Sequence, residues 1–325
     1  MSIAHSAGLT LVGVRCCVCD HDAATLVGTG YDYEYHTSPD LFHAYQCNEC
    51  GTVYLNPRPD VSEFERIYPP EYHSLEFSDE SYSFVHRVRS RLEARRLLRY
   101  CEGAPTTARI LDVGCGDGFH LGLLEAHGEP QWTLEGIDFD RRAVEAARAK
   151  GLIVHLGDLA AAGIEDAAYD VVYTLQTIEH VAHPDVFLAD INRILKPGGR
   201  LVIVTDNNES VDFTMFKRHH WGGYHFPRHW NLFSKASLGR LARDAGFRVD
   251  KIDTIVSPVN WVYSIHNYLV DKRAPSWLVA RFTLKSPVSL AFFTVVDTLL
   301  QLTGRGALLN AFFTKVDAPD ETSGA

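Results

Sequence analysis

The chain has 325 residues, enough for one large domain and one small one. Hydrophobic residues make up 46% and charged residues 22%, a balance typical of soluble globular proteins that bury a sizeable core. The formal net charge of −10 disfavours broad, nonspecific binding to nucleic acid, because a phosphate backbone needs a basic surface to replace its counterions.

No targeting segment is recognised. The N-terminus lacks a basic stretch followed by a long apolar one, so no signal peptide is expected. The most apolar late stretch, Val288–Leu302, contains Asp297 and is shorter than the about 20 apolar residues of a membrane span. We therefore expect a cytoplasmic protein, in which the seven cysteines are thiols or metal ligands.

Residues 1–60 are expected to form a small zinc-ribbon-like domain. They contain two CxxC pairs, Cys16 with Cys19 and Cys47 with Cys50. Two such pairs complete a tetrahedral zinc site with Zn–S distances of about 2.3 Å. Four thiolates leave no open coordination position, so the zinc ion is expected to be structural. Cys17 is expected to be a bystander, because adjacent cysteines rarely share one ion.

Residues 61–104 are expected to be a linker followed by a basic helix. The linker is polar and aromatic, and Pro69-Pro70 interrupts it. The helical pattern begins at Phe84 and repeats arginine every four residues, at Arg87, Arg91, Arg95 and Arg99. Such a stripe favours a solvated face that pairs with acidic neighbours. Contact with a diphosphate or an anionic membrane surface is the alternative.

Residues 105–325 begin with alternating strands and helices, which predicts an α/β fold with a parallel sheet covered on both faces. The expected strands are Ala108–Val113, Trp132–Ile137, Leu152–Leu156, Tyr169–Gln176 and Arg200–Thr205. The expected helices are one that ends near Ala126, then Asp140–Lys150 and Val186–Leu195. The segment Lys196-Pro197-Gly198-Gly199 is expected to break the chain after the last of these helices.

The remaining residues are expected to complete the sheet around an insertion. A helix over Lys235–Ala245 precedes a sixth strand, Arg248–Val256, and the seventh strand is Ala307–Val316. Residues 258–304 between these strands are too long for an ordinary connection and show helical spacing, which predicts a helical insertion. Its aromatic residues are expected to build a lid or a homodimer contact. Peripheral contact with a membrane surface is the alternative.

A glycine-rich turn follows the first strand of the sheet. Gly114, Gly116 and Gly118 allow a sharp turn and close approach of a ligand, at the edge where such sheets bind nucleotides. The dinucleotide fingerprint places its third glycine three residues after the second, whereas the spacing here is two. Asp138 ends the second strand, where a carboxylate accepts hydrogen bonds from ribose hydroxyls. Asp158 ends the third, where it would accept from an adenine amino group.

With YDVVYTLQTIEHV and LKPGGRLVIV following in order, the chain resembles the class I S-adenosylmethionine-dependent methyltransferases. The resemblance covers about residues 108–256 and the final strand, and it implies a Rossmann-like sheet of seven strands. It implies these cofactor contacts: Asp112, Gly114 and Gly116 at the methionine part, Asp138 at the ribose, Asp158 and Leu159 at the adenine, and Gln176 near the sulfonium. Cys115, Gly118 and Phe139 complete the candidate set.

Residues 217–233 follow the fifth strand, where this fold places acceptor-binding residues. His229 is the first candidate for a general base and His225 the second, since an imidazole pKa near 6.5 suits this role. In relatives, a histidine that opens the phrase before Asn-Leu-Phe-Ser often faces the methyl group. The alternative is that these histidines only pack a loop. Arg228 is a candidate partner for an anionic acceptor such as a phosphate or a carboxylate, whereas His180 is expected to be structural.

An N-terminal zinc module joined to this domain resembles the sugar C-methyltransferases and their natural-product relatives. It also resembles ribosomal RNA guanine methyltransferases with a zinc finger, although CNECGTVYLNPRPD is more similar to the first group. We therefore expect methyl transfer to a small-molecule acceptor in biosynthesis: a sugar derivative, a lipid-linked compound or a secondary metabolite. An RNA methyltransferase and a non-catalytic scaffold that binds S-adenosylmethionine are the alternatives.

Overall fold

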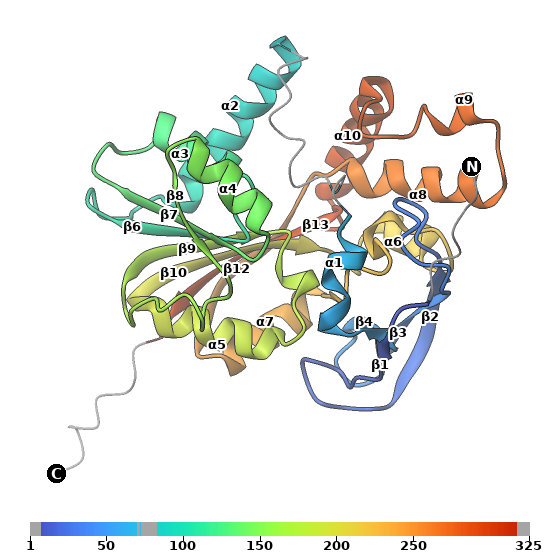
Figure 1. Ribbon diagram of the computed structural model, residues 1–325, viewed down its shortest axis with the longest axis horizontal. Helices are drawn as coiled ribbons and strands as arrows, with labels where there is room; N and C mark the ends of the chain where they lie inside the picture. Colours follow the sequence, from blue (N-terminus) through green and yellow to red (C-terminus); the bar gives the residue numbers. More distant parts are fainter. Residues whose placement is uncertain (1–7, 70–71, 73–82, 317–325) are drawn as a thin grey trace.

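The computed structural model describes residues 8–69, 72 and 83–316, with side chains left undescribed over 83–89 (Figure 1). Arg87 therefore lies outside the described side chains, whereas Arg91, Arg95 and Arg99 are exposed. Among the described residues, no helix is long and apolar enough to cross a membrane.

Seven strands form the central sheet in the order β12-β13-β10-β9-β6-β7-β8. Their bounds are β6 Arg109–Val113, β7 Thr133–Asp138, β8 Ile153–Leu156, β9 Tyr169–Leu175, β10 Leu195–Asp206, β12 Phe247–Ile255 and β13 Leu308–Lys315. The strands from β10 to β8 pair in parallel, and β13 runs antiparallel to both of its neighbours. The predicted α/β sheet of seven strands is confirmed.

Helices cover both faces of this sheet (Figure 1). They are α2 Ser83–Tyr100, α3 Phe119–His127, α4 Arg141–Ala149, α5 Pro184–Ile194 and α7 Lys235–Asp244. Ile110 packs with α2 and α3, whereas its neighbour Leu111 packs with α5 and α7. Successive side chains of a strand point to opposite faces, so a continuous apolar strand such as β6 needs helices on both sides.

The strand β10 begins earlier than expected. Leu195 already pairs with Tyr169, and the register then shifts so that Arg200 pairs with Val171. Gly198, with φ of +70°, lies between these two pairs. The predicted break at residues 196–199 is therefore a bulge within the strand, because the extra residues loop out while pairing with β9 resumes.

The N-terminal part forms a second sheet in the order β11-β4-β3-β2, beside a small pair of β1 and β5. The bounds are β1 Leu11–Val12, β2 Ala24–Gly30, β3 Phe42–Cys47, β4 Val53–Leu55, β5 Arg58–Pro59 and β11 Asn231–Leu232. Strand β11 thus comes from the segment between β10 and β12, far along the chain from the other strands of this sheet. Gly28 also meets that region closely, since a Cβ there would lie 2.2 Å from the carbonyl oxygen of Lys217.

The segment expected to be a linker contains η1 Val61–Glu63 and α1 Phe64–Ile67. Asp60 caps η1 by accepting a hydrogen bond from the backbone of Ser62. Phe64 stacks on Trp230, with ring centroids 5.2 Å apart. The described part of this segment is therefore packed against the protein body.

The predicted helical insertion is confirmed as α8 Val259–Asp271, α9 Ser276–Val279 and α10 Pro287–Gln301. Helix α8 packs on the segment after β10, which forms helix α6 Val211–Phe216 and the short turn η4 Gly222–Tyr224. Trp261 of α8 stacks on Phe293 of α10 with centroids 5.6 Å apart. Buried Asp297 accepts a hydrogen bond from the backbone of Ser257, which fixes α10 to the end of β12.

Candidate active site

The glycine turn has the backbone conformation that its sequence predicts. Gly114, Gly116 and Gly118 all have positive φ, at +79°, +54° and +79°. A Cβ on Gly114 would lie 2.3 Å from Oγ1 of Thr177, so a side chain is excluded there. The turn brings bare backbone to the carboxyl ends of β6 and β9, the edge at which sheets of this kind bind ligands.

Two carboxylates stand at this turn. Asp138, at the end of β7, accepts hydrogen bonds from the backbone N–H groups of Gly116 and Asp140, each at 2.8 Å. Asp112 is buried, and its Oδ2 has no hydrogen-bond partner among the described residues. Burial raises the pKa of Asp112 well above its ordinary value, and the charge of Asp138 adds to the shift. An acceptor oxygen of this kind fits a ligand that brings its own hydroxyl or ammonium donors.

The other cofactor candidates differ in exposure and in backbone conformation. The side chains of Cys115 and Leu159 are buried in the hydrophobic core. Phe139 is 55% exposed, and Asp158 is exposed while it caps a local turn. Gln176 adopts φ of +54° at the end of β9, an unusual conformation for a residue with a side chain. Its amide donates to Glu179.

Three histidines gather beside this edge. His229 lies between the other two, with ring centroids 4.6 Å from His180 and 5.0 Å from His225. His180 ends η3 (Ile178–His180), which follows β9, whereas the other two belong to the segment after β10. Both predicted base candidates are thus in one cluster. His219 and His220 bond elsewhere, to Thr29 and Asp271.

His229 is oriented by two oxygens. Its Nδ1 lies 2.8 Å from the carbonyl oxygen of Gly223 and 3.1 Å from Oδ2 of Asp206, at the end of β10. A carbonyl oxygen only accepts, so Nδ1 carries a proton, and in the neutral ring Nε2 holds the free electron pair. Burial lowers the pKa of His229, but Asp206 and the charge of Glu179 outweigh it, and the pKa is raised overall.

Glu179 is the buried acid of the cluster. Its carboxylate accepts hydrogen bonds from Gln176 and, at 2.8 Å, from the hydroxyl of Thr205. Burial raises the pKa of Glu179 to about 7, against the lowering effect of His229. One ligand-type atom each of Glu179, His180 and His229 lies within 4.8 Å of the others. The three groups therefore form one electrostatically coupled unit.

The N-terminal domain supplies a partner for the second candidate base. Oε1 of Glu34 lies 2.8 Å from Nδ1 of His225, and both side chains are largely buried. Burial lowers the pKa of His225, although Glu34 opposes the shift. Sequence spacing gave no sign of this pair, whose members are 191 residues apart.

Arg228 does not have the predicted role. It is fully buried and pairs with Asp32 at 2.9 and 3.2 Å. The rest of its guanidinium donates to the carbonyl oxygens of Ile67 and Phe226 and to the hydroxyl of Thr37. Because its donors are engaged within the protein, Arg228 is a structural link to the N-terminal domain rather than a partner for an anionic acceptor.

Two tyrosines of the expected linker also line the cluster. The hydroxyl of Tyr68 lies 2.8 Å from Nδ1 of His180, and the Tyr68 ring lies 6.0 Å from that of Phe139. Tyr72 packs on His225 with centroids 5.9 Å apart. Tyr68 therefore touches both the histidine cluster and the residue after Asp138. Nothing in the local sequence of the linker indicated this position.

The four predicted cysteine ligands lie together. Sγ of Cys16 is 3.4 Å from that of Cys50, Sγ of Cys19 is 3.5 Å from that of Cys47, and all four sulfurs lie within 4.8 Å of one another. Four thiols at these separations fit a tetrahedral zinc site.

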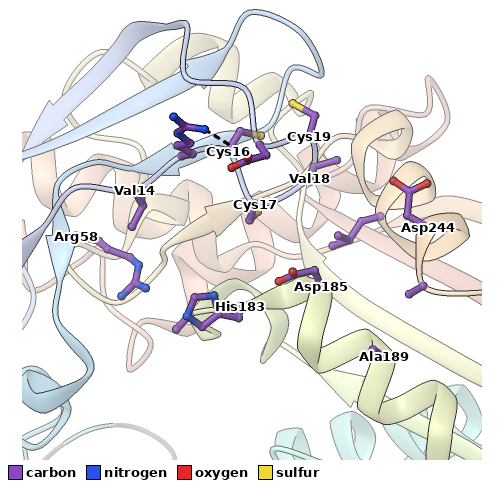
Figure 2. Close-up of a pocket in the computed structure, with 15 residues that line it drawn as sticks. Val14, Cys16, Cys17, Val18, Cys19, Arg58, His183, Asp185, Ala189 and Asp244 are labelled. Atoms are coloured by element: carbon purple, nitrogen blue, oxygen red, sulfur yellow. Dashed lines mark hydrogen bonds and ion pairs between the residues drawn. The ribbon is translucent and has the colours of Figure 1, made fainter.

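Cys17 is outside this group. It lines a hollow of about 730 Å³ between the cysteine segment and α5, together with Arg58, His183 and Asp185 (Figure 2). Two of the predicted metal ligands, Cys16 and Cys19, also line this hollow, whereas none of the predicted catalytic residues and no residue of the glycine turn does.

Comparison with known proteins agrees with this architecture. A family described as a methyltransferase domain matches residues 84–252. A 37.1 kDa protein of transposon TN4556 from Streptomyces fradiae is 34% identical over 160 residues, which cover 45% of each protein. A ubiquinone biosynthesis O-methyltransferase from Cereibacter sphaeroides is 33% identical over 172 residues, covering 48% of this chain and 67% of that protein. The chain thus spans about half to two thirds of the length of these relatives.

Among solved structures, geranyl diphosphate C-methyltransferase from Streptomyces coelicolor A3(2) aligns with a TM-score of 0.49 and 14% identity, over 74% of this chain and 89% of that one. This similarity concerns the fold alone. The family match covers more than half of the chain and includes the glycine turn, Asp138 and Glu179. The chain therefore belongs to the family of S-adenosylmethionine-dependent methyltransferase domains.

Proposed function

We propose that the protein transfers a methyl group from S-adenosylmethionine to a small-molecule acceptor in a biosynthetic pathway, with His229 as the general base. The acceptor class is a sugar derivative, a lipid-linked compound or a secondary metabolite. The observation that carries the proposal is the position of Tyr68, which contacts both His180 and Phe139 and so joins the histidine cluster to the cofactor edge.

The residues at the glycine turn fit this cofactor. Asp138 would accept from the ribose hydroxyls, and the unpartnered oxygen of Asp112 would face the donor groups of the methionine part. Asp158 and Leu159 would lie at the adenine. When bound, the cofactor supplies a methyl group already activated by its sulfonium.

The chain has to align the acceptor and remove its proton. Nε2 of His229 is the atom that would take that proton, because Gly223 and Asp206 hold the other ring nitrogen as a donor. Asp206 would then stabilise the imidazolium that forms. His225, oriented by Glu34, is the second base candidate. Glu179 and the tyrosines would complete the polar wall of the acceptor site.

The four cysteines would hold a structural zinc ion. With all positions filled by thiolates, the ion takes no part in the chemistry. Its role would be to fold the domain that carries Asp32 and Glu34.

A biosynthetic acceptor is favoured over RNA for two reasons. The chain has a net charge of −10, and its relatives include an enzyme named for ubiquinone biosynthesis. Nucleic acid that co-purifies with the protein, or binding that falls steeply with salt, would favour the RNA alternative instead.

The cofactor site is tested by calorimetric titration of S-adenosylmethionine and S-adenosylhomocysteine. We expect Asp138→Ala to weaken binding by about tenfold or more, since hydrogen bonds that involve a charged group contribute about 1.5–3 kcal/mol. Asp166→Ala is the matched control, because this exposed carboxylate pairs with Arg193 and not with a residue of the glycine turn. A folded wild type that binds neither compound would refute the proposal.

A further inference from the structure

Helix α10 has two apolar faces. On one face, Leu290, Phe293, Val296 and Leu300 pack into a cluster with α8. On the other, five apolar side chains are between 61% and 83% exposed: Val288, Phe292, Val295, Leu299 and Leu302. Their spacing of four, three, four and three residues places them in one stripe along the helix. Nothing in the described part of the chain covers this stripe, which we call the α10 stripe.

The surroundings of the α10 stripe are basic. Residues 259–305 contain five Lys or Arg and two Asp, a local charge of +3 in a chain whose total is −10. One of the two acids, Asp297, is buried, so the exposed surface is more basic still. Arg273, Arg281 and Lys285 are exposed, and none of them forms an ion pair with a described residue.

An exposed tryptophan lies among these cations. Trp277 is 64% exposed, and the guanidinium of Arg281 stands 5.7 Å from its ring centroid. The hydroxyl of Ser289, in the first turn of α10, donates to the carbonyl oxygen of Arg281. The basic segment is therefore fixed to the end of the helix where the α10 stripe begins.

The insertion is also joined to the acceptor segment. The backbone N–H of Gly222 in η4 donates to the hydroxyl of Ser264 in α8 at 2.8 Å. The next residue, Gly223, is the one whose carbonyl oxygen orients His229. Figure 1 shows α8, α9 and α10 together at one end of the molecule. Whatever the α10 stripe binds would thus lie on the same insertion that supports the acceptor segment.

We propose that the insertion docks on the surface of an anionic lipid bilayer. The α10 stripe would enter the boundary between headgroups and acyl chains, as amphipathic surface helices do. Arg273, Arg281 and Lys285 would meet the lipid phosphates, and Trp277 would lie at headgroup depth, where tryptophan is enriched.

A second copy of the chain fits this surface less well. The stripe follows one helix of 15 residues, which is about 22 Å long. A strip of that length and about 10 Å wide covers about 220 Å², against the about 800 Å² per partner that a stable interface buries. A self-contact would also bring the cations of both copies together, whereas lipid phosphates neutralise them.

The test is flotation of the full chain with vesicles of phosphatidylcholine alone and of an equal mixture with phosphatidylglycerol. We expect wild type to float with the mixed vesicles and to bind neutral vesicles about tenfold less. The variants Phe292→Asp/Leu299→Asp and Arg281→Glu/Lys285→Glu should each weaken binding to the mixed vesicles by about tenfold or more. Because these side chains are exposed, the thermal midpoints should stay at the wild-type value.

The matched control is Ile153→Asp/Val186→Asp, which changes two side chains that are 56% and 55% exposed on the catalytic domain. It should float like wild type. The inference is overturned if wild type stays in the dense fraction with both vesicles, or if the control loses binding equally. It is also overturned if light scattering finds a dimer that Phe292→Asp/Leu299→Asp dissociates. Titration of S-adenosylmethionine should be unchanged in all variants, so this result is separate from the cofactor test.

Discussion

The cofactor edge and the histidine cluster are built from the chain in different ways. Gly114, Gly116 and Asp138 belong to two adjacent strands and the turn between β6 and α3, within 25 residues of sequence. The cluster around His229 instead draws Glu34 from the N-terminal domain, Tyr68 from the segment after it, and Glu179 from η3. The geometry of the cofactor edge therefore depends on one local turn and two adjacent strands. The geometry of the histidine cluster depends on the correct packing of segments that are far apart in the sequence.

Of the changes that follow from this contrast, removal of zinc is expected to have the largest effect on stability and turnover. A chelator, or Cys47→Ser, should unfold the N-terminal sheet, since zinc binding provides about 10–16 kcal/mol in small zinc domains. Glu34 and Asp32 would then leave His225 and Arg228, so turnover should collapse while Asp138 still binds cofactor. Metal analysis should find one zinc ion per chain.

Cys17→Ser is the control for that experiment and should keep its zinc. Equal turnover by the zinc-free protein would show that the cluster assembles without the N-terminal sheet.

The next largest effect is expected from loss of the buried ion pair between Asp32 of the N-terminal domain and Arg228 of the acceptor segment. Asp32→Ala should lower the free energy of unfolding by about 3–5 kcal/mol, because it leaves the Arg228 guanidinium buried without its counter-charge. Denaturant unfolding measures this change. Asp244→Ala removes the exposed pair with Arg240 and should cost less than about 1 kcal/mol. Equal decreases in the free energy of unfolding of both variants would mean that the buried pair stabilises the protein no more than an exposed pair does.

The third effect concerns catalysis. His229→Ala should lower turnover by about 100-fold or more, the usual contribution of a general base. His219→Ala is the matched control, since His219 is exposed in the same segment and its ring bonds to Thr29, outside the cluster. Release of S-adenosylhomocysteine with an acceptor from a screen gives the rate. Unchanged turnover of a folded His229→Ala variant would show that His229 is not the general base.

The smallest effect is a shift in pH dependence. The base must be neutral to accept a proton, so turnover should rise with pH through the raised pKa of His229. Asp206→Asn removes the carboxylate that raises this pKa, and the rising limb should therefore move to lower pH. Imidazole titration by NMR checks the same shift without an acceptor. A limb that stays in place would assign it to Glu179 instead, whose pKa is raised to about 7.

The difference between local and long-range construction also explains which features can be predicted from the sequence. The strands, the glycine turn and the four cysteines follow from periodicity and short spacings, and the structure places them as expected. The break predicted at residues 196–199 became a bulge because pairing with β9 continues on both sides of Gly198. Such pairing involves a distant strand, so the glycine and proline signal alone could not reveal it.

The partners of the histidines lie beyond sequence reasoning for the same reason. Asp32 and Arg228 are 196 residues apart, and Tyr68 and His180 are 112 apart. No short spacing links them, and a lone arginine near candidate bases is equally suited to binding an anionic acceptor. Only the fold shows that its charge is already matched.

Strand β11 has a consequence for how this protein can be recombined. Asn231 and Leu232 pair with Tyr54 and Val53, two residues after the histidine proposed as the base. The edge of the N-terminal sheet is therefore supplied by the acceptor segment. A chimera that exchanges residues 1–60 for the module of a relative has to carry its matching partner for that edge. A chimera joined at residue 60, the predicted domain boundary, would separate β11 from the strands β2, β3 and β4 of the same hydrogen-bonded sheet.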